Sequence, residues 1–372
     1  MKNTKTSSLL RLVAFLLITV VLIGAVGLVS EGMNAQPDTD PPVDETEKEN
    51  KDESNQSGTP PTTQNPTIPQ PPIPEHLNYL SGLECSKESV DMLPTAYLID
   101  SSMPLYGMSD SILNIEFPIE DGSSRILMFT QADKSIGKIG SITKTRKFIN
   151  TLCAFFGGIL IHNGEDDSVE YASHAEIENV IDLSKSTAYA YSEGNAHLYT
   201  NSSLMANALD NSRVPTRFSS SPVLPFYFRD YFSETIKAQE YARTITLPFG
   251  QDNRVSLSFD DSSERYLYQK NGANRVDLHN GEYIYYDNAF VLFCDSTTYE
   301  RSDATELVLD TDGGGTGYYF TGGTMIKILW SKDANGSLHF TDTKGDLVCI
   351  NRGSTYIAYY KTTQKAQVSI VN

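Results

Sequence analysis

The sequence predicts an α+β fold, with a mixed α/β N-terminal part followed by an antiparallel β-rich C-terminal part. In the first part, short apolar runs typical of buried strands alternate with segments of helical periodicity, such as 143–156. In the second part, apolar and polar residues alternate, as in 254–259, and turn dipeptides such as Asn271-Gly272 recur at short intervals. We therefore predict two domains, an N-terminal one over 76–237 and a β-rich one over 238–372.

The chain begins with a short basic stretch and an apolar run that is long enough to cross a membrane. The run 12–29 has no charged residue, and at about 1.5 Å per residue it spans roughly 27 Å of bilayer core. Cations precede the run (Lys2, Lys5 and Arg11) and an acidic cluster follows it. The positive-inside rule then predicts a cytoplasmic N-terminus over 1–11 and a transmembrane signal anchor over 12–29. The competing interpretation is a signal peptide that is cleaved near Gly27.

The segment 30–75 reads as a linker. It is rich in Pro, Asp, Glu, Thr, Asn and Gln and has few large apolar residues. Such a segment cannot bury enough apolar surface to offset the entropy lost on ordering, so we predict a disordered, proline-rich spacer. The protein is then a single-pass protein of the cell membrane that holds its folded body outside the cytoplasm.

Charge and motif content exclude several classes of function. The chain has 29 Lys and Arg against 47 Asp and Glu, a formal net charge of −18. An acidic surface repels phosphate backbones, so no nucleic-acid partner is predicted. The histidines are scattered, no H-E-x-x-H or G-x-S-x-G motif occurs, and the Gly-rich loop 310–317 matches neither a calcium loop nor a P-loop. We predict neither a metal nor a cofactor.

The four cysteines show no metal-binding spacing. They are Cys85, Cys153, Cys294 and Cys349, and none forms a C-x-x-C pair. Cys153 and Cys294 lie within apolar runs, which predicts buried free thiols. A disulfide is the alternative if the body faces an oxidising compartment.

The N-terminal part contains short apolar runs that suit buried strands. These runs are 96–99, 112–119, 125–130 and 159–161. The turn Glu120-Asp121-Gly122-Ser123 favours a hairpin between the second and third runs. Helical patterns follow over 143–156, 175–183 and 203–209, the first with Ser141 or Thr143 as candidate N-cap and Gly157 as its stop.

The C-terminal part contains strand-like runs separated by Gly-containing turns. These runs are 244–249, 254–259, 266–269, 289–294, 306–309, 317–321, 325–330, 347–350 and 356–360. Their short length and regular spacing predict antiparallel pairing of successive strands.

The stretch 113–156 concentrates the candidate functional residues. Lys144, Arg146 and Lys147 occupy the first turn predicted for the helix, where the helix dipole disfavours cations and favours anions. This pattern predicts a ligand-binding site for a carboxylate or phosphate group. Its candidate residues are Glu116, Glu120, Arg125, Ser141, Lys144, Arg146 and His162. In the structural alternative, Arg125 and Arg146 pair with Glu116 and Glu120.

An acid/base role is a second hypothesis for the same stretch. Glu116 and Glu120 are four residues apart on a predicted strand, so they share one face about 13 Å apart, too far for a glycosidase pair. The alternative function is a hydrolase or transferase acting on a cell-wall polymer, which would use Glu116 or Asp100 with His162.

The ordered motifs resemble the YerB-like lipoproteins, a family defined by domain of unknown function 3048. The resemblance runs through LSGL at 80–83, PTAYLID at 94–100, Glu116-x-Pro118-x-Glu120-x-Gly122-x-x-Arg125, IGSI at 139–142, IHNG at 161–164, HLYT at 197–200 and GYYF at 317–320. It implies a membrane-tethered, extracytoplasmic protein of a bacterial envelope, with N- and C-terminal parts and no established activity. The family is usually tethered through a lipidated cysteine, whereas this chain has the apolar run.

These observations favour a non-enzymatic module of the cell envelope. We predict that it is anchored by its N-terminal helix and that it binds an anionic envelope ligand or a protein partner through the Glu116/Arg125/Arg146 face.

Overall fold

The computed structural model describes residues 72–372, except 132, 167–178, 194–196, 237, 239, 301–304 and 334–336. The predicted N-terminal segment 1–11, the anchor 12–29 and the linker up to residue 71 lie outside the described residues. Within the described part, none of the helices is both long and apolar enough to cross a membrane.

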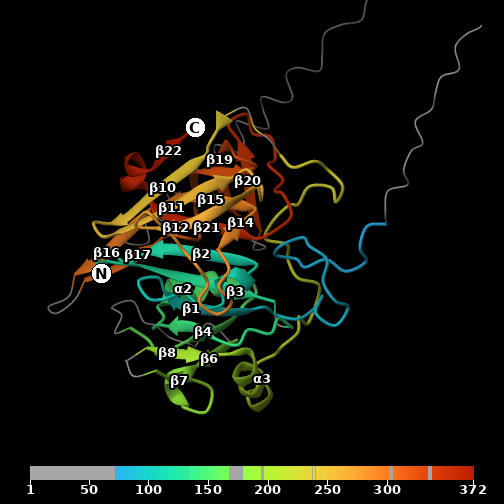
Figure 1. Ribbon diagram of the computed structural model, residues 1–372, viewed down its shortest axis with the longest axis vertical. Helices are drawn as coiled ribbons and strands as arrows, with labels where there is room; N and C mark the ends of the chain where they lie inside the picture. The colour runs from blue at the N-terminus through green and yellow to red at the C-terminus, as the bar shows by residue number, and fades with distance from the viewer. Residues whose placement is uncertain are drawn as a thin grey trace, which may run out of the picture. The chain divides into compact units, whose positions relative to one another are not determined.

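The larger of the sheets has 14 strands. They are β1 (Thr95–Asp100), β2 (Leu113–Pro118), β3 (Ser124–Thr130), β4 (Ile139–Ile142), β5 (Ile159–His162), β6 (Val180–Asp182), β7 (Tyr191–Ser192), β8 (Leu198–Thr200), β9 (Glu240–Tyr241), β15 (Asn288–Cys294), β18 (Gly314–Thr321), β19 (Thr324–Lys332), β20 (Leu338–Asp342) and β21 (Thr355–Lys361). Their main order is β20-β19-β18-β15-β21-β2-β3-β1-β4-β8-β7, with β5, β6 and β9 off this path (Figure 1).

The centre of this sheet contains the predicted hairpin and one departure from the predicted topology. Strands β2 and β3 pair antiparallel around the predicted turn. Strand β21, from near the C-terminus, lies parallel to both β15 and β2. The sheet therefore takes strands from both sides of residue 238, and the described residues belong to one compact unit.

Two further sheets come from the C-terminal part. The smaller one has β10 (Thr244–Gly250), β11 (Asn253–Asp260), β12 (Arg265–Lys270), β13 (Ala273–Asn274), β14 (Tyr285–Tyr286) and β22 (Ser369–Val371), and β16 (Ser296–Glu300) pairs with β17 (Thr305–Leu309). The pairs of these two sheets are antiparallel. The β-rich character predicted for the C-terminal part is confirmed. The run 347–350 is an exception, since Leu347 and Ile350 form only isolated bridges.

The core lies on both faces of the large sheet. Ile126 and Met128 of β3 belong to a hydrophobic cluster shared with Leu247 and Leu257 of the smaller sheet, which lies beside β2, β15 and β21 in Figure 1. Leu127 and Phe129 point to the opposite face, where a second cluster includes the helix α2 (Lys147–Phe155). Because successive strand residues face opposite ways, β3 is buried along its whole length.

Both clusters consist only of residues beyond 78. The described unit therefore has its own core and its own strand ladders, which are the requirements for an independently folding domain. A fragment spanning 72–372 is accordingly expected to fold without the preceding residues.

The helices differ from the predicted ones in position. Helix α2 begins at Lys147 rather than Thr143, because the backbone amides of Thr143 and Thr145 donate to the carbonyls of Leu98 and Gly164. A helix was predicted over 175–183, of which the structure describes 179–183. The strand β6 forms there instead and pairs in parallel with β5. Helix α3 (Ser202–Asn211) confirms the short helix predicted over 203–209, and the Asn201 side chain caps it by accepting from the amide of Leu204.

Candidate functional site

Four side chains form a charged cluster where α2 begins, and we call Glu120, Arg125, Arg146 and Asp166 the charged cluster. Arg146 donates from both terminal nitrogens to the two carboxylate oxygens of Glu120, each at 2.6 Å, and its Nε donates to Asp166 at 2.7 Å. Arg125 Nη1 donates to the same Asp166 oxygen at 2.8 Å and to the Lys144 carbonyl at 2.9 Å. Two cations thus meet two carboxylates, and the cluster is neutral overall.

The pKa values agree with this pairing. Burial raises the pKa of Glu120, but the hydrogen bonds and charge of Arg146, together with backbone hydrogen bonds, hold that pKa below its usual value. Asp166 behaves in the same way: burial raises the pKa of its carboxyl, and the charges and hydrogen bonds of Arg125 and Arg146 together lower it below its usual value. Both carboxylates are therefore ionised at neutral pH.

Glu116 is not part of the charged cluster. It lies opposite Ile126 in the β2–β3 register, whereas Arg125 lies opposite Phe117, so Glu116 and Arg125 point to opposite faces of the sheet. Glu116 is fully buried. Its carboxylate accepts from the hydroxyls of Ser124 at 2.5 Å, Tyr268 at 3.0 Å and Tyr356 at 2.8 Å. These donors connect the large sheet to the smaller one.

A buried lysine extends this polar interior. Lys270 Nζ donates to the carbonyl and the hydroxyl of Ser101, and that hydroxyl is hydrogen-bonded to Ser124 at 2.6 Å. Burial lowers the pKa of Lys270, and the charge of Glu116 partly opposes that shift. Burial, followed by the charge of Glu116, raises the pKa of Tyr268 well above its usual value, so the phenol stays a neutral donor.

The side chains of the remaining predicted site residues have other roles than binding the charged cluster. Ser141 is buried within β4, five residues before the Arg146 N-cap, so its amide is not at a helix terminus. Lys144 is exposed and contributes its carbonyl, rather than its ammonium group, to Arg125. His162 is fully buried at the end of β5, and its Nδ1 lies 2.8 Å from the Gly164 carbonyl oxygen.

The geometry separates Glu116 from the other residues of the acid/base hypothesis. Glu120 lies beyond the end of β2 in the turn, so strand alternation does not place it on the face of Glu116. The register of β1 and β5 puts His162 and Asp100 on the face of Arg125, which is opposite to Glu116. Within the described residues, no group of three or more His, Cys, Asp or Glu is arranged to hold a metal. All four cysteines are free thiols, and Cys153 and Cys294 are buried as predicted.

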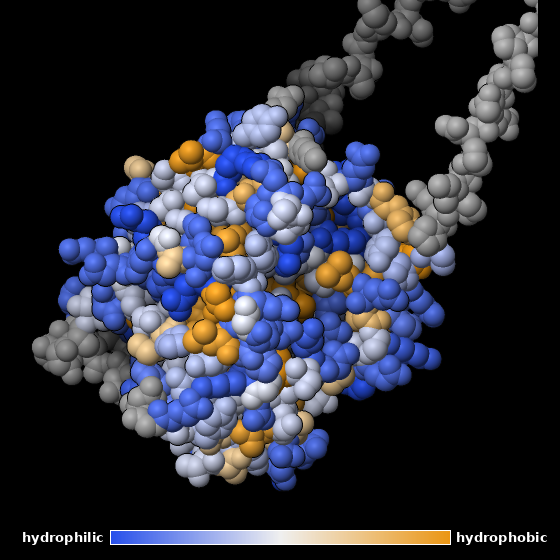
Figure 2. Space-filling view, in the orientation of Figure 1, coloured by the Kyte–Doolittle hydropathy of each residue, from blue (hydrophilic) through white to orange (hydrophobic). Residues whose placement is uncertain are grey.

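A second candidate site is an apolar groove of about 600 Å³. We call it the aromatic groove. It lies between three segments that are distant in sequence, 77–82, 221–228 and 349–352. Tyr79, Phe226, Tyr227 and Phe228 line it, and Leu224 and Tyr227 expose 49% and 38% of their surface. Hydrophilic side chains cover most of the face in Figure 2, so an apolar groove of this size is a distinctive feature of the molecule.

Backbone hydrogen bonds fix the walls of the groove. The amide of Ile350 donates to the Tyr227 carbonyl at 2.8 Å, and the amide of Arg229 donates to the Ile350 carbonyl at 3.0 Å. Arg352 donates to the carbonyls of Gly82 and Arg229 and lies over the Phe228 ring. A Cβ at Gly82 would come within 2.7 Å of the Arg352 side chain and 3.0 Å of Phe228, so glycine permits this close packing. The groove is therefore preformed.

Sequence reasoning identified the arginines but not Asp166 as their partner, and it did not find the aromatic groove. The groove residues 224–228 read LPFYF, an aromatic run without strand alternation and just before the predicted domain boundary. That run was the available signal. The three segments meet only in the folded structure.

Comparisons with known proteins identify relatives but no activity. Residues 245–357 match the family model of the DUF3048 C-terminal domain, a protein of unknown function. The fold is similar to the crystal structure of the YerB protein from Bacillus subtilis, with a TM-score of 0.68 and 18% identity over 80% of this chain and 99% of that chain. No curated protein matches the chain. Together, the two matches confirm the resemblance to the YerB-like DUF3048 family.

Proposed function

We propose that this YerB-like chain is a non-enzymatic binding module of a bacterial cell envelope, and that its aromatic groove takes an extended, proline-containing segment of a protein partner. The observation that carries this proposal is the groove itself. It combines a large apolar volume, exposed aromatic and aliphatic side chains, and walls that backbone hydrogen bonds hold in place.

The backbone groups that form the walls of the aromatic groove are already hydrogen-bonded, and this favours one mode of peptide recognition. A peptide that adds a strand to a sheet needs free backbone donors and acceptors along the binding edge. Here the backbone groups of Tyr227, Arg229 and Ile350 are bonded to one another. A polyproline-type segment needs no such edge, because it docks its prolines and aliphatic side chains on aromatic rings. Tyr227, with its exposed ring, is the natural anchor for such a segment.

The charged cluster supports a structural role better than an anionic ligand. Each arginine already donates to Asp166, and Arg146 also binds Glu120 through two hydrogen bonds. A carboxylate or phosphate would have to displace one of these carboxylates, so its binding would be offset by the loss of existing ion pairs. A protein partner at the groove carries no such cost.

The proposed location rests on the N-terminal sequence. The uncharged run 12–29, the preceding cations and the long polar linker are typical of a signal anchor with an extracytoplasmic body. Carbonate extraction of membranes tests the anchor, and we expect the full chain to stay in the membrane fraction. A mature N-terminus near Leu28 would instead establish a cleaved signal peptide.

Peptide binding to the 72–372 fragment tests the groove. The probes are fluorescein-labelled decapeptides with P-x-x-P spacing and aliphatic residues at the x positions, and binding is followed by fluorescence anisotropy. We expect saturable binding that Tyr227→Ala weakens by at least about tenfold, since it removes the exposed ring at the centre of the contact.

Tyr241→Ala is the matched control, because Tyr241 is 66% exposed and does not line the groove. It should leave the affinity unchanged. If no peptide binds saturably, or if both tyrosine variants lose affinity equally, the groove is not the site.

A further inference from the structure

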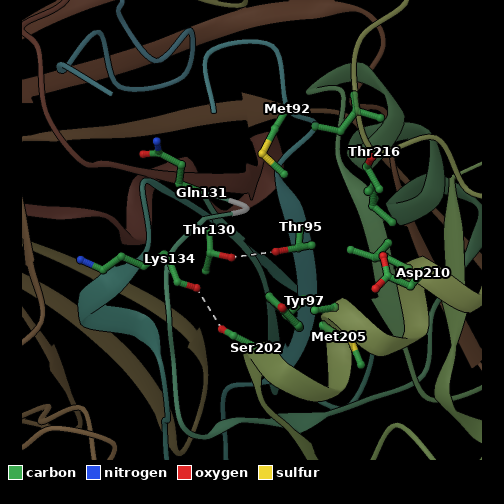
Figure 3. Close-up of a pocket in the computed structure, with 14 residues that line it drawn as sticks. Met92, Thr95, Tyr97, Thr130, Gln131, Lys134, Ser202, Met205, Asp210 and Thr216 are labelled. Carbon is green, nitrogen blue, oxygen red and sulfur yellow. Dashed lines mark hydrogen bonds between the residues drawn. The ribbon is translucent and has the colours of Figure 1, made fainter. Parts of the chain in front are cut away.

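A second cavity lies on another part of the molecule, between α3 and the large sheet. Its volume is about 200 Å³. Figure 3 shows its floor on β1 and β3, with Thr95, Tyr97 and Thr130, and one wall on α3, with Met205 and Asp210. This cavity shares no lining residue with the aromatic groove.

The floor of the cavity is polar but neutral. The hydroxyls of Thr95 and Thr130 lie 2.8 Å apart and are hydrogen-bonded to each other. Both hydroxyls also hydrogen-bond the Tyr97 phenol, so the three hydroxyl groups share their hydrogens and keep acceptor lone pairs for a ligand. Burial raises the pKa of the neighbouring Tyr97 to about 12, which keeps its phenol neutral at physiological pH.

The walls combine polar side chains with an adaptable apolar part. Met92 and Met205 extend their thioether side chains from opposite sides in Figure 3, and Leu209 and Ile159 complete the apolar lining. Methionine side chains adjust to irregular ligands because they are unbranched and polarisable. The Lys134 ammonium is paired with Asp110 at 3.0 Å and points away from the cavity in Figure 3. Asp210 is the other charged residue of the lining, so an anionic ligand would meet a carboxylate and no unpaired cation.

The volume sets the size of the ligand. An apolar cavity of about 150 Å³ in another protein accommodates benzene. A cavity of about 200 Å³ thus has room for a six-membered ring and one small substituent. Conventional drug-sized ligands need pockets of at least about 300 Å³, so they are too large.

We propose that this cavity is a binding site for a neutral, ring-sized molecule that carries one hydroxyl group. The ring lies between Met92, Met205 and Leu209, and the hydroxyl donates a hydrogen bond to the Thr95–Thr130 pair. This site is independent of the aromatic groove and of the partner proposed for it.

Methionine-methyl NMR on the 72–372 fragment tests the proposal directly. The fragment is labelled at its methionine methyl groups and titrated with phenol, which is neutral at pH 7 and matches the volume. We expect saturable shifts of the Met92 and Met205 signals. Met103 and Met325 do not line the cavity, and their signals should stay in place.

A paired substitution separates the role of the hydroxyls from that of the cavity. Thr95→Val/Thr130→Val removes both members of the hydrogen bond at nearly constant volume, so neither hydroxyl is left unpaired. We expect phenol to bind the double variant about three- to tenfold more weakly, which is the contribution of one neutral hydrogen bond, while benzene binds both forms equally. The proposal is overturned by shifts that do not saturate, or by equal phenol affinity in both forms.

Discussion

Glu116 and Glu120 are four residues apart, yet they lie in opposite electrostatic environments. Glu116 is sealed between two sheets, where its carboxylate accepts from three hydroxyls. Glu120 lies in the turn after β2, keeps 24% of its side chain exposed and binds Arg146 through two hydrogen bonds. The difference arises because β2 ends at Pro118, so the alternation of the strand no longer applies to Glu120.

The two environments stabilise a carboxylate by different means. In the dry interface a charge is tolerated only when hydrogen bonds replace its hydration, and the neutral hydroxyls do so without adding further charges. In the charged cluster, Arg146 provides a counter-charge to a partly exposed carboxylate, which solvent and salt partly screen. Changes at Glu116 should therefore have larger effects on stability than changes in the charged cluster.

The largest expected effect is that of Glu116→Ala. The substitution leaves the hydroxyls of Tyr268 and Tyr356 without an acceptor and Lys270 without its nearby negative charge. We expect the free energy of unfolding of the 72–372 fragment to fall by about 4 kcal/mol, because each buried hydroxyl left without an acceptor costs about 1–3 kcal/mol. Urea denaturation measures the change.

Glu116→Gln is the matched control, because the amide keeps one carbonyl acceptor and a similar volume. It should lose clearly less stability than the alanine variant. If Glu116→Ala costs no more than Arg146→Ala, the comparison between the two carboxylates is wrong.

The next effect is that of Arg146→Ala, for which we expect a loss of about 2 kcal/mol. The Arg146 side chain is only 6% exposed, and its removal leaves Glu120 without its cation while Asp166 keeps Arg125. Thermal unfolding with and without inorganic phosphate measures the effect. An unchanged or higher melting temperature, together with phosphate stabilisation of the natural protein only, would indicate that Arg146 is retained for an anionic ligand.

The local elements of the fold could be predicted from the sequence. The alternating apolar residues and the Gly122-containing turn predicted the hairpin of β2 and β3, because strand period and turn chemistry are local properties. The parallel position of β21 between β15 and β2 was not predictable in this way, since the contact between Glu116 and Tyr356 joins residues 240 positions apart.

The predicted start of the helix and the partners of its arginines depended on long-range contacts in the same way. The cations Lys144 and Arg146 were read as the first turn of a helix, but hydrogen bonds from Thr143 and Thr145 to Leu98 and Gly164 delay its start. The partner Asp166 lies 20 residues beyond Arg146. A sequence pattern locates charged residues, whereas their partners depend on how distant strands are arranged.

Lowering the pH should have a smaller effect on stability, through the carboxylates of the charged cluster. The pKa values of Glu120 and Asp166 are lowered in the folded state, so their contribution is complete above the usual carboxyl pKa of about 4 and is lost as the pH falls through the lowered values. Between pH 5 and pH 2.5, the natural protein should lose about 1 kcal/mol more stability than Arg146→Ala, in which Glu120 has no cation to hold its pKa down. Urea denaturation at both pH values would contradict this if the two proteins lost equal stability.

The smallest effect is expected at Lys144, which the sequence placed in the same site as Arg146. Its ammonium is exposed, and its bond to Arg125 uses the main-chain carbonyl, which alanine retains. Lys144→Ala should therefore change the free energy of unfolding by no more than about 0.5 kcal/mol, as is usual for surface positions without specific contacts. A loss above about 1 kcal/mol in urea denaturation would mean that the ammonium contributes to the charged cluster. The neutral balance of two arginines and two carboxylates would then no longer describe how the start of α2 is held.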